Sequence, residues 1–338
     1  MSEAIYMHIT KDHNLLPNNT FGIKAKADTF IEYDSVEELQ TLIPKIQDKK
    51  VLHIGGGSNL LFTDDFHGVI LHSRIKGMEI VEETEDTVFL KVGAAVVWDE
   101  LVEQAVCNGW YGIENLSLIP GETGAAAVQN IGAYGVEAKD VIFTVHTIDL
   151  KTAEPRIFKN EECEYAYRHS IFKAQLKGRY AVTHVTFRLS KQFEPKLNYG
   201  NILQALGDQE PTAQNVRNAI IGTRNEKLPD PKVMGNAGSF FMNPVVPHAK
   251  YEQLKSLYPD MPAFVMDHGV KIPAGWLIEQ TGWKGKALGK AAVHDKQALV
   301  LVNLGGADSS DIVRLSDTVR KAVYDKFGIE ISPEVNFI

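Results

Sequence analysis

The stretch from Pro120 to Gly135 constrains the fold of this chain more than any other segment. Its sixteen residues include four glycines and four alanines, and few of its side chains are polar. Such small side chains let a large, flat ligand lie against the backbone, whose amide and carbonyl groups can then bond the ligand's edge. Close packing between a helix and a strand uses the same composition. The stretch alone leaves these two interpretations about equally open.

A second glycine-rich segment, Gly55 to Asn59, directly follows the predicted strand Val51 to Ile54. Its successive N–H groups could form an anion-binding nest, and its three glycines would let a diphosphate approach the backbone. The segment is not the dinucleotide-binding fingerprint, because that spacing needs a third glycine where Leu60 stands. The alternative is a plain tight turn, which is about equally probable for this motif alone.

Length and charge limit the class of protein. The 338 residues are too many for one typical core and indicate two or three domains. The net charge of -8 argues against a general nucleic-acid binder, although a local basic pocket for one small anion stays possible. No apolar run approaches the roughly 20 residues that span a bilayer, and Met1 to Asn19 lacks the pattern of a secretory signal. We therefore expect a soluble, cytoplasmic protein with neither nucleic acid nor membrane as a partner. We also expect a monomer and a small-molecule substrate, which length and charge do not themselves indicate.

Cysteine and histidine spacing predicts no metal site. Cys107 and Cys163 lie outside any CxxC motif, so we expect two buried thiols in a reducing compartment. His53, His184 and His294 lack a metal-ligand spacing such as HxxxH, and we interpret them as structural or surface residues.

Hydrophobic periodicity predicts alternating strands and helices. A capping box at Ser35 to Glu38 predicts the start of a helix, and Gly109 and Gly328 predict the ends of two others. The polar, proline-containing stretch Arg224 to Pro231 indicates a boundary, and the tail from Ile329 to Ile338 should pack back on the body. The strands are expected over 51–54, 69–71, 88–92, 141–150, 181–189 and 298–302, and the other two helices over 98–106 and 312–323.

Three further polar residues stand in unusual surroundings. Arg168 lies among aromatic residues, and its guanidinium can fork onto a carboxylate, but an isolated arginine is far more often a solvated surface charge. Ser239 stands between a glycine and two phenylalanines, without a histidine base at a recognisable nucleophile spacing, so the default role is structural. Glu334, four residues from the C-terminus, would by default be a frayed tail charge.

Taken together, five segments resemble the UDP-N-acetylenolpyruvoylglucosamine reductases, the MurB family of UDP-N-acetylmuramate dehydrogenases. They occur in the family's order from Asn19 to Phe337, and unrelated proteins would have to match each segment independently. Leu197 to Gly200 also resembles the tyrosine loop of the insertion-bearing subtype. The five segments are Gly55 to Asn59, Pro120 to Gly135, Tyr167 to Phe172, Lys227 to Asn243 and Pro333 to Val335.

The resemblance implies an α+β fold of three domains. Two of them form an FAD-binding fold of the vanillyl-alcohol-oxidase/PCMH-like type, without the dinucleotide fingerprint, and the other binds the substrate. The expected boundaries are 1–77 plus 328–338 for the first FAD-binding subdomain, 78–227 for the second, and 228–327 for the substrate-binding domain. FAD would lie between the first two, and the third would close over a UDP-sugar.

The resemblance also implies an enzyme. It would be an oxidoreductase that uses NADPH and non-covalent FAD to reduce UDP-N-acetylglucosamine enolpyruvate to UDP-N-acetylmuramate in peptidoglycan precursor synthesis. Hydride would reach the terminal carbon of the enolpyruvyl group, Arg168 would neutralise the developing charge, Ser239 would protonate the adjacent carbon, and Glu334 would stabilise the enol form.

The family's binding residues carry over to matching positions of this sequence, and none of them implies a metal. The flavin contacts would be Ile54, Gly55, Gly56, Gly57, Ser58, Asn59, Pro120, Gly121, Thr123, Gly124, Ala125, Gln129, Asn130, Gly132, Ala133 and Tyr134. The substrate contacts would be Tyr134, Tyr167, Arg168, Tyr199, Arg224, Lys227, Asn243 and Gln297.

The sequence departs from the family pattern at two positions, and two other functions stay open. His169 stands where the family often has an acidic residue, and Met242 where it often has lysine. An FAD-dependent oxidase of a sugar or hydroxy acid could share the fold, because fold does not fix reaction. Ser239 and Glu334 disfavour it, since an oxidase needs a base rather than a proton donor to carbon. A non-catalytic flavin or nucleotide-sugar binding module is the third interpretation.

Overall fold

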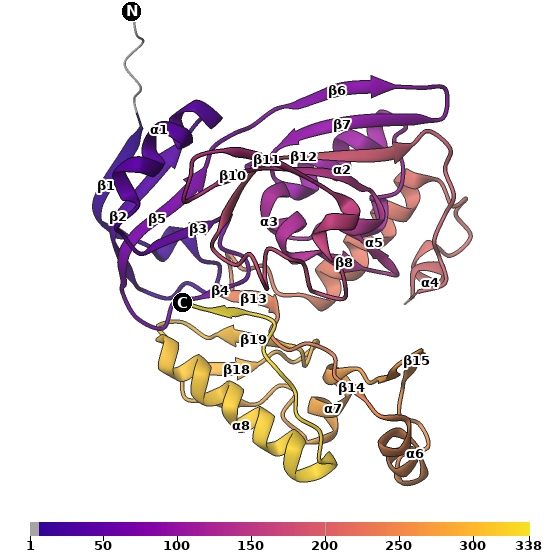
Figure 1. Ribbon diagram of the computed structural model, residues 1–338. Helices are drawn as coiled ribbons and strands as arrows, with labels where there is room; N and C mark the ends of the chain where they lie inside the picture. The colour runs from indigo at the N-terminus through magenta and orange to yellow at the C-terminus, as the bar shows by residue number, and fades with distance from the viewer. Residues whose placement is uncertain (1–6, 200) are drawn as a thin grey trace, which may run out of the picture. The chain divides into compact units, whose positions relative to one another are not determined.

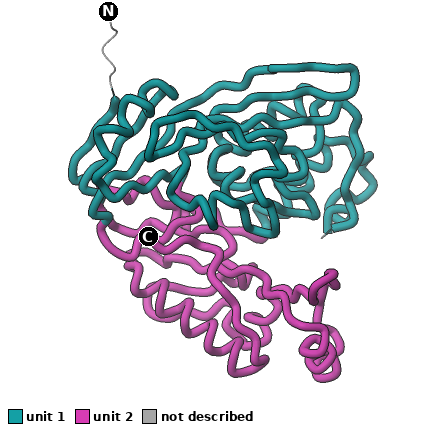
Figure 2. The backbone as a smooth tube through the Cα atoms, in the orientation of Figure 1, with its two compact units in different colours: residues 1–13, 27–56, 66–226 teal, residues 14–26, 57–65, 227–338 magenta. Residues whose placement is uncertain are grey.

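The structure is a computed structural model that describes residues 7–199 and 201–338. Its contacts divide the chain into two compact units, coloured separately in Figure 2. Unit 1 comprises residues 1–13, 27–56 and 66–226, and unit 2 comprises residues 14–26, 57–65 and 227–338. The expected boundary between Arg224 and Pro231 coincides with the last of these divisions. The count of three domains stays a prediction.

The first sheet of unit 1 has the strand order β1-β2-β5-β3, and both β2 and β3 pair in parallel with β5. Helix α1 (Val36–Ile46) packs Leu39 and Ile43 into the core of this region. The hydroxyl of Ser35 accepts the N–H of Glu38 at 3.1 Å, which confirms the predicted helix start. The strands are β1 (His8–Asn14), β2 (Lys26–Tyr33), β3 (Val51–Ile54) and β5 (Phe66–Ser73).

The second sheet of unit 1 is antiparallel, with the order β11-β10-β12-β7-β6 (Figure 1). Val185, Phe187 and Leu189 of β12 are buried, and so are Val182 and Thr186 on the opposite face, so this central strand is covered on both faces over part of its length. These elements are β6 (Met78–Glu83), β7 (Thr87–Gly93), β10 (Ile142–Asp149), β11 (Pro155–Lys159), β12 (Tyr180–Ser190), the short pair β8 (Gly132–Ala133) and β9 (Val136–Glu137), and the helices α2 (Trp98–Cys107), α3 (Thr123–Gln129), α4 (Ile202–Leu206) and α5 (Ala213–Lys227).

Unit 2 contains a four-stranded sheet of order β13-β19-β18-β17, against which helix α8 packs (Figure 1). Asp308 caps the start of α8, and Gly328 ends it in the left-handed region at φ 61°, which confirms the predicted stop. A second sheet has the order β14-β16-β15. The elements are β13 (Asn236–Ser239), β14 (Val245–Val246), β15 (Phe264–Met266), β16 (Gly269–Lys271), β17 (Ala287–Leu288), β18 (Ala291–Val293), β19 (Val300–Asn303), α6 (His248–Leu257), α7 (Ala274–Gln280) and α8 (Ser309–Phe327).

The C-terminal tail packs back on the body, as predicted. Strand β20 (Asn336–Phe337) pairs in parallel with β4 (Leu60–Leu61). Ile329, Ile331 and Val335 are buried in the core of unit 2. The regular apolar spacing of the tail therefore reflects real burial rather than a frayed end.

Helix α5 continues to Lys227, so the boundary segment predicted from Arg224 to Pro231 begins inside a helix. One sequence-based expectation was wrong. Cys107 is exposed, whereas Cys163 is buried as expected. Cys107 is the last residue of α2, and the buried residues of that helix are Trp98, Leu101, Val102, Ala105 and Val106. No helix in the part of the chain that the structure describes is long and apolar enough to cross a bilayer.

Candidate active site

Part of the small-residue stretch serves close packing. Thr123 is buried, and both its N–H and its hydroxyl donate to the main-chain oxygen of Val96, at 2.9 and 3.0 Å. The N–H of Gly124 donates to Ala94 at 2.9 Å, and a methyl group on Gly124 would lie 2.9 Å from the Cβ of Ala94. The packing interpretation therefore holds for Thr123 and Gly124, and their contact with the flavin stays a prediction.

The other face of α3 lies against the first glycines of the second loop. Ala125 is exposed on this face. A methyl group on Gly55 would lie 3.1 Å from the Cβ of Ala125. A methyl group on Gly56 would meet nothing nearer than 3.8 Å. Within unit 1 the two predicted flavin loops therefore meet, and the side chains of Ala125 and Glu122 lie against the backbone of Gly55, whereas Gly56 is exposed. Such a surface fits a flavin or its diphosphate.

The rest of the second loop belongs to unit 2. Gly57 has φ +68°, and a methyl group there would lie 1.9 Å from the main-chain oxygen of Asn18, so only glycine fits. Asn59 accepts the N–H of Asn336 at 3.1 Å, and its amide donates to the main-chain oxygen of Glu334 at 3.4 Å. The loop is thus joined to the C-terminal segment that carries Glu334.

The side chain of Arg168 contacts the C-terminal end of the stretch 120–135. Its guanidinium donates to the main-chain oxygen of Gly132 at 2.7 Å and lies 5.2 Å from the ring centre of Tyr167. Its backbone has φ 54°, in a turn that Ala166 and His169 close with mutual hydrogen bonds. The structure therefore brings Arg168 and Tyr167 together with the predicted flavin stretch.

Side chains from the stretch itself hold this turn. Asn130, buried and left-handed at the end of α3, donates to the main-chain oxygen of Ala166 at 2.8 Å. Ser170 donates to the main-chain oxygen of Val128 at 2.6 Å. At the departure from the family pattern, Nδ1 of His169 lies 3.2 Å from the main-chain oxygen of Glu164. The position of Arg168 thus depends on several side-chain bonds.

Three of the predicted substrate residues gather in unit 1. The amide of the fully buried Asn115 donates to the main-chain oxygens of Tyr134 and Lys196, at 2.9 and 2.8 Å, which ties the stretch to the loop that carries Tyr199. Burial raises the pKa of the Tyr134 hydroxyl against the opposing effect of Arg224, and burial lowers the pKa of Arg224. Gly200, also part of the predicted tyrosine loop, lies outside the described residues.

In unit 2, main-chain pairing brings Ser239 and Glu334 to neighbouring segments. The N–H of Glu334 donates to the main-chain oxygen of Phe240 at 2.7 Å, and the N–H of Met242 donates to that of Ser332 at 2.9 Å. Glu334 is half-buried in this pairing, so it is not a frayed tail charge. Phe240 and Phe241 are buried, whereas the space beside Gly238 is open.

The remaining predicted substrate residues also lie in unit 2. Asn243 accepts the N–H of Ala274 at 2.9 Å, at the start of α7. A methyl group on Gly275, one residue further, would lie 3.3 Å from Oε1 of Gln297. Asn243 and Gln297 therefore flank the same helix start. Lys227 is exposed at the end of α5.

Comparison with known proteins decides the family. The family model for the C-terminal domain of UDP-N-acetylenolpyruvoylglucosamine reductases matches residues 230–338, and an FAD binding domain matches residues 27–154. The chain is 57% identical, over 96% of its length and 99% of the relative's, to the UDP-N-acetylenolpyruvoylglucosamine reductase of Bacteroides fragilis. It is 46% identical to that of Porphyromonas gingivalis over 98% of its length and 100% of the relative's.

The chain belongs to the UDP-N-acetylenolpyruvoylglucosamine reductase family. It is therefore an FAD-binding oxidoreductase, in a family that uses NADPH as its reductant and acts in peptidoglycan precursor synthesis. Its fold is that of the reductase from Thermus caldophilus, with a TM-score of 0.71 and 21% identity over 98% of this chain and 99% of the other.

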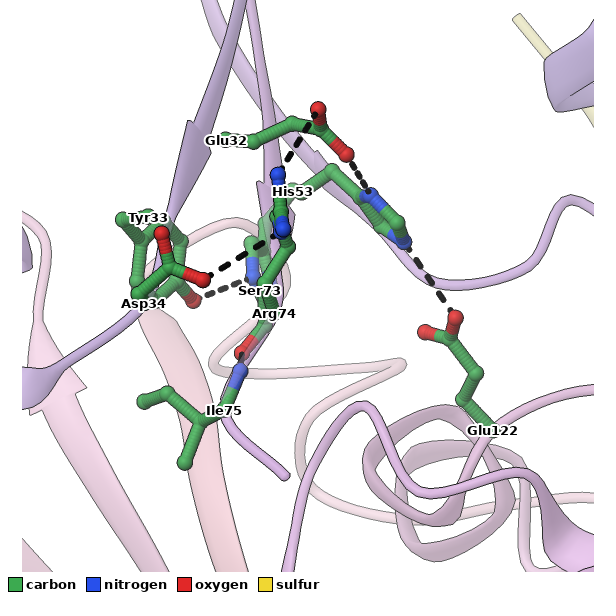
Figure 3. Close-up of polar contacts among 9 residues, drawn as sticks. Glu32, Tyr33, Asp34, His53, Ser73, Arg74, Ile75 and Glu122 are labelled. Carbon is green, nitrogen blue, oxygen red and sulfur yellow. Dashed lines mark hydrogen bonds and ion pairs between the residues drawn. The ribbon is translucent and has the colours of Figure 1, made fainter. Parts of the chain in front are cut away.

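Sequence reasoning missed some residues that organise the site of this reductase. Asn115 ties two segments together, but an isolated asparagine carries no local signal of such a role. Glu32, His72 and Glu122 form a polar cluster beside the two predicted flavin loops. Figure 3 labels Glu32 and Glu122, and its dashed lines join both carboxylates to the unlabelled imidazole between them. The three residues are 40 and 50 residues apart in the chain, so no motif could reveal them.

Proposed function

We propose that this chain reduces UDP-N-acetylglucosamine enolpyruvate to UDP-N-acetylmuramate, with NADPH as the reductant and non-covalent FAD as the carrier. The observation that carries the proposal is the 57% identity, along almost the whole chain, to a reductase named for this substrate. Because the substrates are soluble nucleotides of precursor synthesis, we place the reaction in the cytoplasm.

The proposed reaction adds a hydride and a proton across the enolpyruvyl double bond. The terminal carbon receives the hydride, the adjacent carbon receives the proton, and NADPH becomes NADP⁺. FAD, when bound, supplies a carrier that takes hydride from NADPH and gives it to carbon. The tasks left to the chain are to hold the two ligands, to offset negative charge and to deliver the proton.

Arg168 is the proposed site of charge stabilisation. Hydride addition leaves negative charge on the carbon next to the substrate carboxylate, which spreads as an enolate. A fixed cation at that place lowers the barrier because its charge is already oriented. The contacts of Arg168 with Gly132 and Tyr167 support this role, since they fix the guanidinium beside the proposed flavin stretch.

Ser239 is the proposed general acid, and Glu334 is proposed to stabilise the enol form. A hydroxyl is a competent proton donor, and the open space beside Gly238 gives a ligand access to it. The buried rings of Phe240 and Phe241 would limit replacement of the donor by water. The pairing of Glu334 with Phe240 keeps the carboxyl on the segment next to Ser239, which supports a shared role.

The remaining polar residues are proposed to bind the UDP-sugar. Lys227, Arg224 and the hydroxyls of Tyr134 and Tyr199 suit a diphosphate, because charge-assisted hydrogen bonds to phosphate are strong. Tyr167, Asn243 and Gln297 are proposed as further contacts.

Consumption of NADPH tests the proposal. We expect the purified protein to be yellow and to oxidise NADPH continuously only when UDP-N-acetylglucosamine enolpyruvate is present, with UDP-N-acetylmuramate identified by mass spectrometry. UDP-N-acetylglucosamine, which lacks the enolpyruvyl group, is the matched control. Oxygen consumption with simple sugars or hydroxy acids, without turnover of the enolpyruvyl sugar, would contradict the proposal and support an oxidase.

A further inference from the structure

The imidazole of His72 lies between two carboxylates of unit 1. Its Nδ1 is 3.1 Å from Oε1 of Glu32, and its Nε2 is 3.3 Å from Oε1 of Glu122 (Figure 3). A neutral imidazole has one N–H, so only the imidazolium can donate to both carboxylates. The side chain of His72 is 17% exposed, which limits competition from water. The geometry is that of a largely buried cation held by two anions.

Glu122 connects this cation to the flavin loops. It is the N-cap residue of α3, yet its side chain makes no capping hydrogen bond and is directed to His72 instead. A methyl group on Gly55 would lie 3.2 Å from Oε2 of Glu122, and one on Gly56 would lie 3.8 Å from Oε1. The carboxylate therefore lies against the backbone to which we assign the flavin diphosphate. An unbalanced negative charge there would repel that diphosphate.

The surroundings also favour an anionic ligand at this edge. Strands β2, β3 and β5 run in parallel and end here, and ligands of open parallel sheets bind beyond the carboxyl ends of the strands. A cavity of about 430 Å³ at this edge is lined by His72 and Glu122 together with Asp34, Arg74 and Lys76. Asp34 is paired with Arg74 at 3.2 Å, which leaves His72 and Lys76 as the cations toward an anionic ligand.

We propose that His72 is a positioning residue for FAD: as a cation it fixes Glu122 against Gly55 and Gly56 and offsets the charge of that carboxylate beside the diphosphate. This inference rests on the proposed flavin placement. His72, on β5, would make no contact with the flavin itself and would act through Glu122.

The inference predicts that FAD retention depends on pH. Burial alone would lower the pKa of His72, but the hydrogen bonds and charges of Glu122 and Glu32 outweigh burial and raise it above its ordinary 6.5. The contribution of His72 is therefore complete below about pH 6.5 and is lost as pH rises through the raised value. The other titratable and charged groups around the imidazole include His53 on β3, Tyr33 on β2, Asp34 after β2, and Arg74 and Lys76 after β5.

Release of FAD from the full-length holoenzyme measures this dependence. After dilution of the holoenzyme, recovery of flavin fluorescence gives the release rate at each pH. We expect the rate to rise as pH increases above 6.5, and His72→Gln to raise it roughly 10- to 100-fold at pH 6, because a hydrogen bond to a charged group is lost. Glu122→Gln should flatten the pH dependence without faster release, and His72→Gln/Glu122→Gln should return close to the wild-type rate.

These variants separate positioning from a merely structural role. Neutralising Glu122 can also reverse a loss of fold stability, because no unpaired carboxylate remains, so the urea midpoints of the same variants are measured beside FAD release. Faster FAD release in His72→Gln that only accompanies a lower urea midpoint would overturn the inference, as would a lack of rescue by Glu122→Gln or wild-type FAD release in His72→Gln. Gly56→Ala is the control for the flavin placement, since the protein has room for this methyl group. If Gly56→Ala speeds FAD release and His72→Gln does not, only the role of His72 is wrong. If neither variant changes release, the proposed placement of the flavin is wrong as well.

Discussion

The two units hold their candidate site residues in different ways. In unit 1, side chains do the holding: Asn130 fastens the Arg168 turn, and Asn115 fastens Tyr134. In unit 2, backbone hydrogen bonds pair the segments that carry Ser239 and Glu334, and the side chains of Asn236 and Asn59 add one bond beside each. Substitution of Asn130 or Asn115 should therefore displace site residues of unit 1, whereas substitution of the Ser239 or Glu334 side chain should change chemistry and leave the main-chain geometry intact.

Ser239→Ala should produce the largest effect and should be purely chemical. General acid catalysis contributes roughly 10² to 10⁴ in rate, so steady-state turnover of the enolpyruvyl sugar should fall by about that factor. The urea midpoint and FAD content should stay at the wild-type values, because main-chain bonds position residue 239. Ser239→Cys should recover part of the activity, since a thiol can also donate a proton. A large loss of stability in Ser239→Ala would show that the serine side chain, and not only the main chain, holds this part of unit 2.

Asp99→Ala should destabilise unit 1 strongly. Asp99 on α2 accepts two hydrogen bonds from the buried guanidinium of Arg217 on α5, at 2.6 and 3.0 Å. Removal of one partner leaves a buried charge unpaired and costs about 3–5 kcal/mol, measurable by urea unfolding. The matched double variant Asp99→Ala/Arg217→Met should recover most of this loss, because no unpaired charge remains. Equal destabilisation of the single and double variants would show that the loss of stability does not come from the unpaired charge of Arg217.

The pair of Asp99 and Arg217 should also make the free energy of unfolding fall at acidic pH. Burial acts to raise the pKa of Asp99, but hydrogen bonds from Arg217 and from the N–H of Leu118, with the charges of Arg217 and Arg224, lower it below its ordinary 3.8. The contribution of Asp99 is therefore present above about pH 3.8 and is lost as pH falls through the lowered value. Unfolding free energies at pH 3 and pH 6 should differ less in the double variant than in the wild type.

Lys227→Ala should affect binding more than structure. Lys227 is exposed at the end of α5, and a lysine on a diphosphate contributes binding energy. Loss of one charge-assisted hydrogen bond should raise the KM for the enolpyruvyl sugar roughly 10- to 100-fold and should lower kcat by a smaller factor. Steady-state kinetics with Lys227→Arg as the charge-preserving control measure this. An unchanged KM would remove Lys227 from the site.

Asn130→Asp should have the smallest of these effects and should show the dependence of unit 1 on side chains. Aspartate keeps the shape and the acceptor for the N–H of Lys139 but loses the donors to Ala166 and to Glu137. We expect a loss of about 1–3 kcal/mol in unfolding free energy and slower turnover, because the Arg168 turn loses its fastening. Turnover at the wild-type rate would show that Arg168 does not depend on this bond.

Much of the fold followed from local patterns. Capping signals predicted α1 and α8, and runs of β-branched and aromatic residues predicted β10 and β12. Helix α5 was missed because Arg217 interrupts its apolar stripe, and that arginine is buried only through its pairing with Asp99. No residue pattern within α5 reports a partner that lies 118 residues away in the chain.

The sequence predicted which segments contribute to the candidate site. It did not predict which residues of a segment pack in the core and which are open to a ligand. Composition singled out the stretch 120–135, yet small side chains occupy both faces of α3, so composition could not separate buried Gly124 from exposed Ala125. The cluster of Glu32, His72 and Glu122 depends on strand register and on the turn before α3, which only the folded structure provides.

Stopped-flow absorbance of the flavin in Ser239→Ala tests the central claim most directly, because it separates the two halves of the reaction. The account predicts that NADPH bleaches the flavin of this variant as fast as that of the wild type, since that step needs no proton from residue 239. It predicts that the return of colour on addition of the enolpyruvyl sugar slows by roughly 10² to 10⁴. A return as fast as in the wild type, or an equal slowing of both halves, would contradict the assignment of Ser239 as the proton donor.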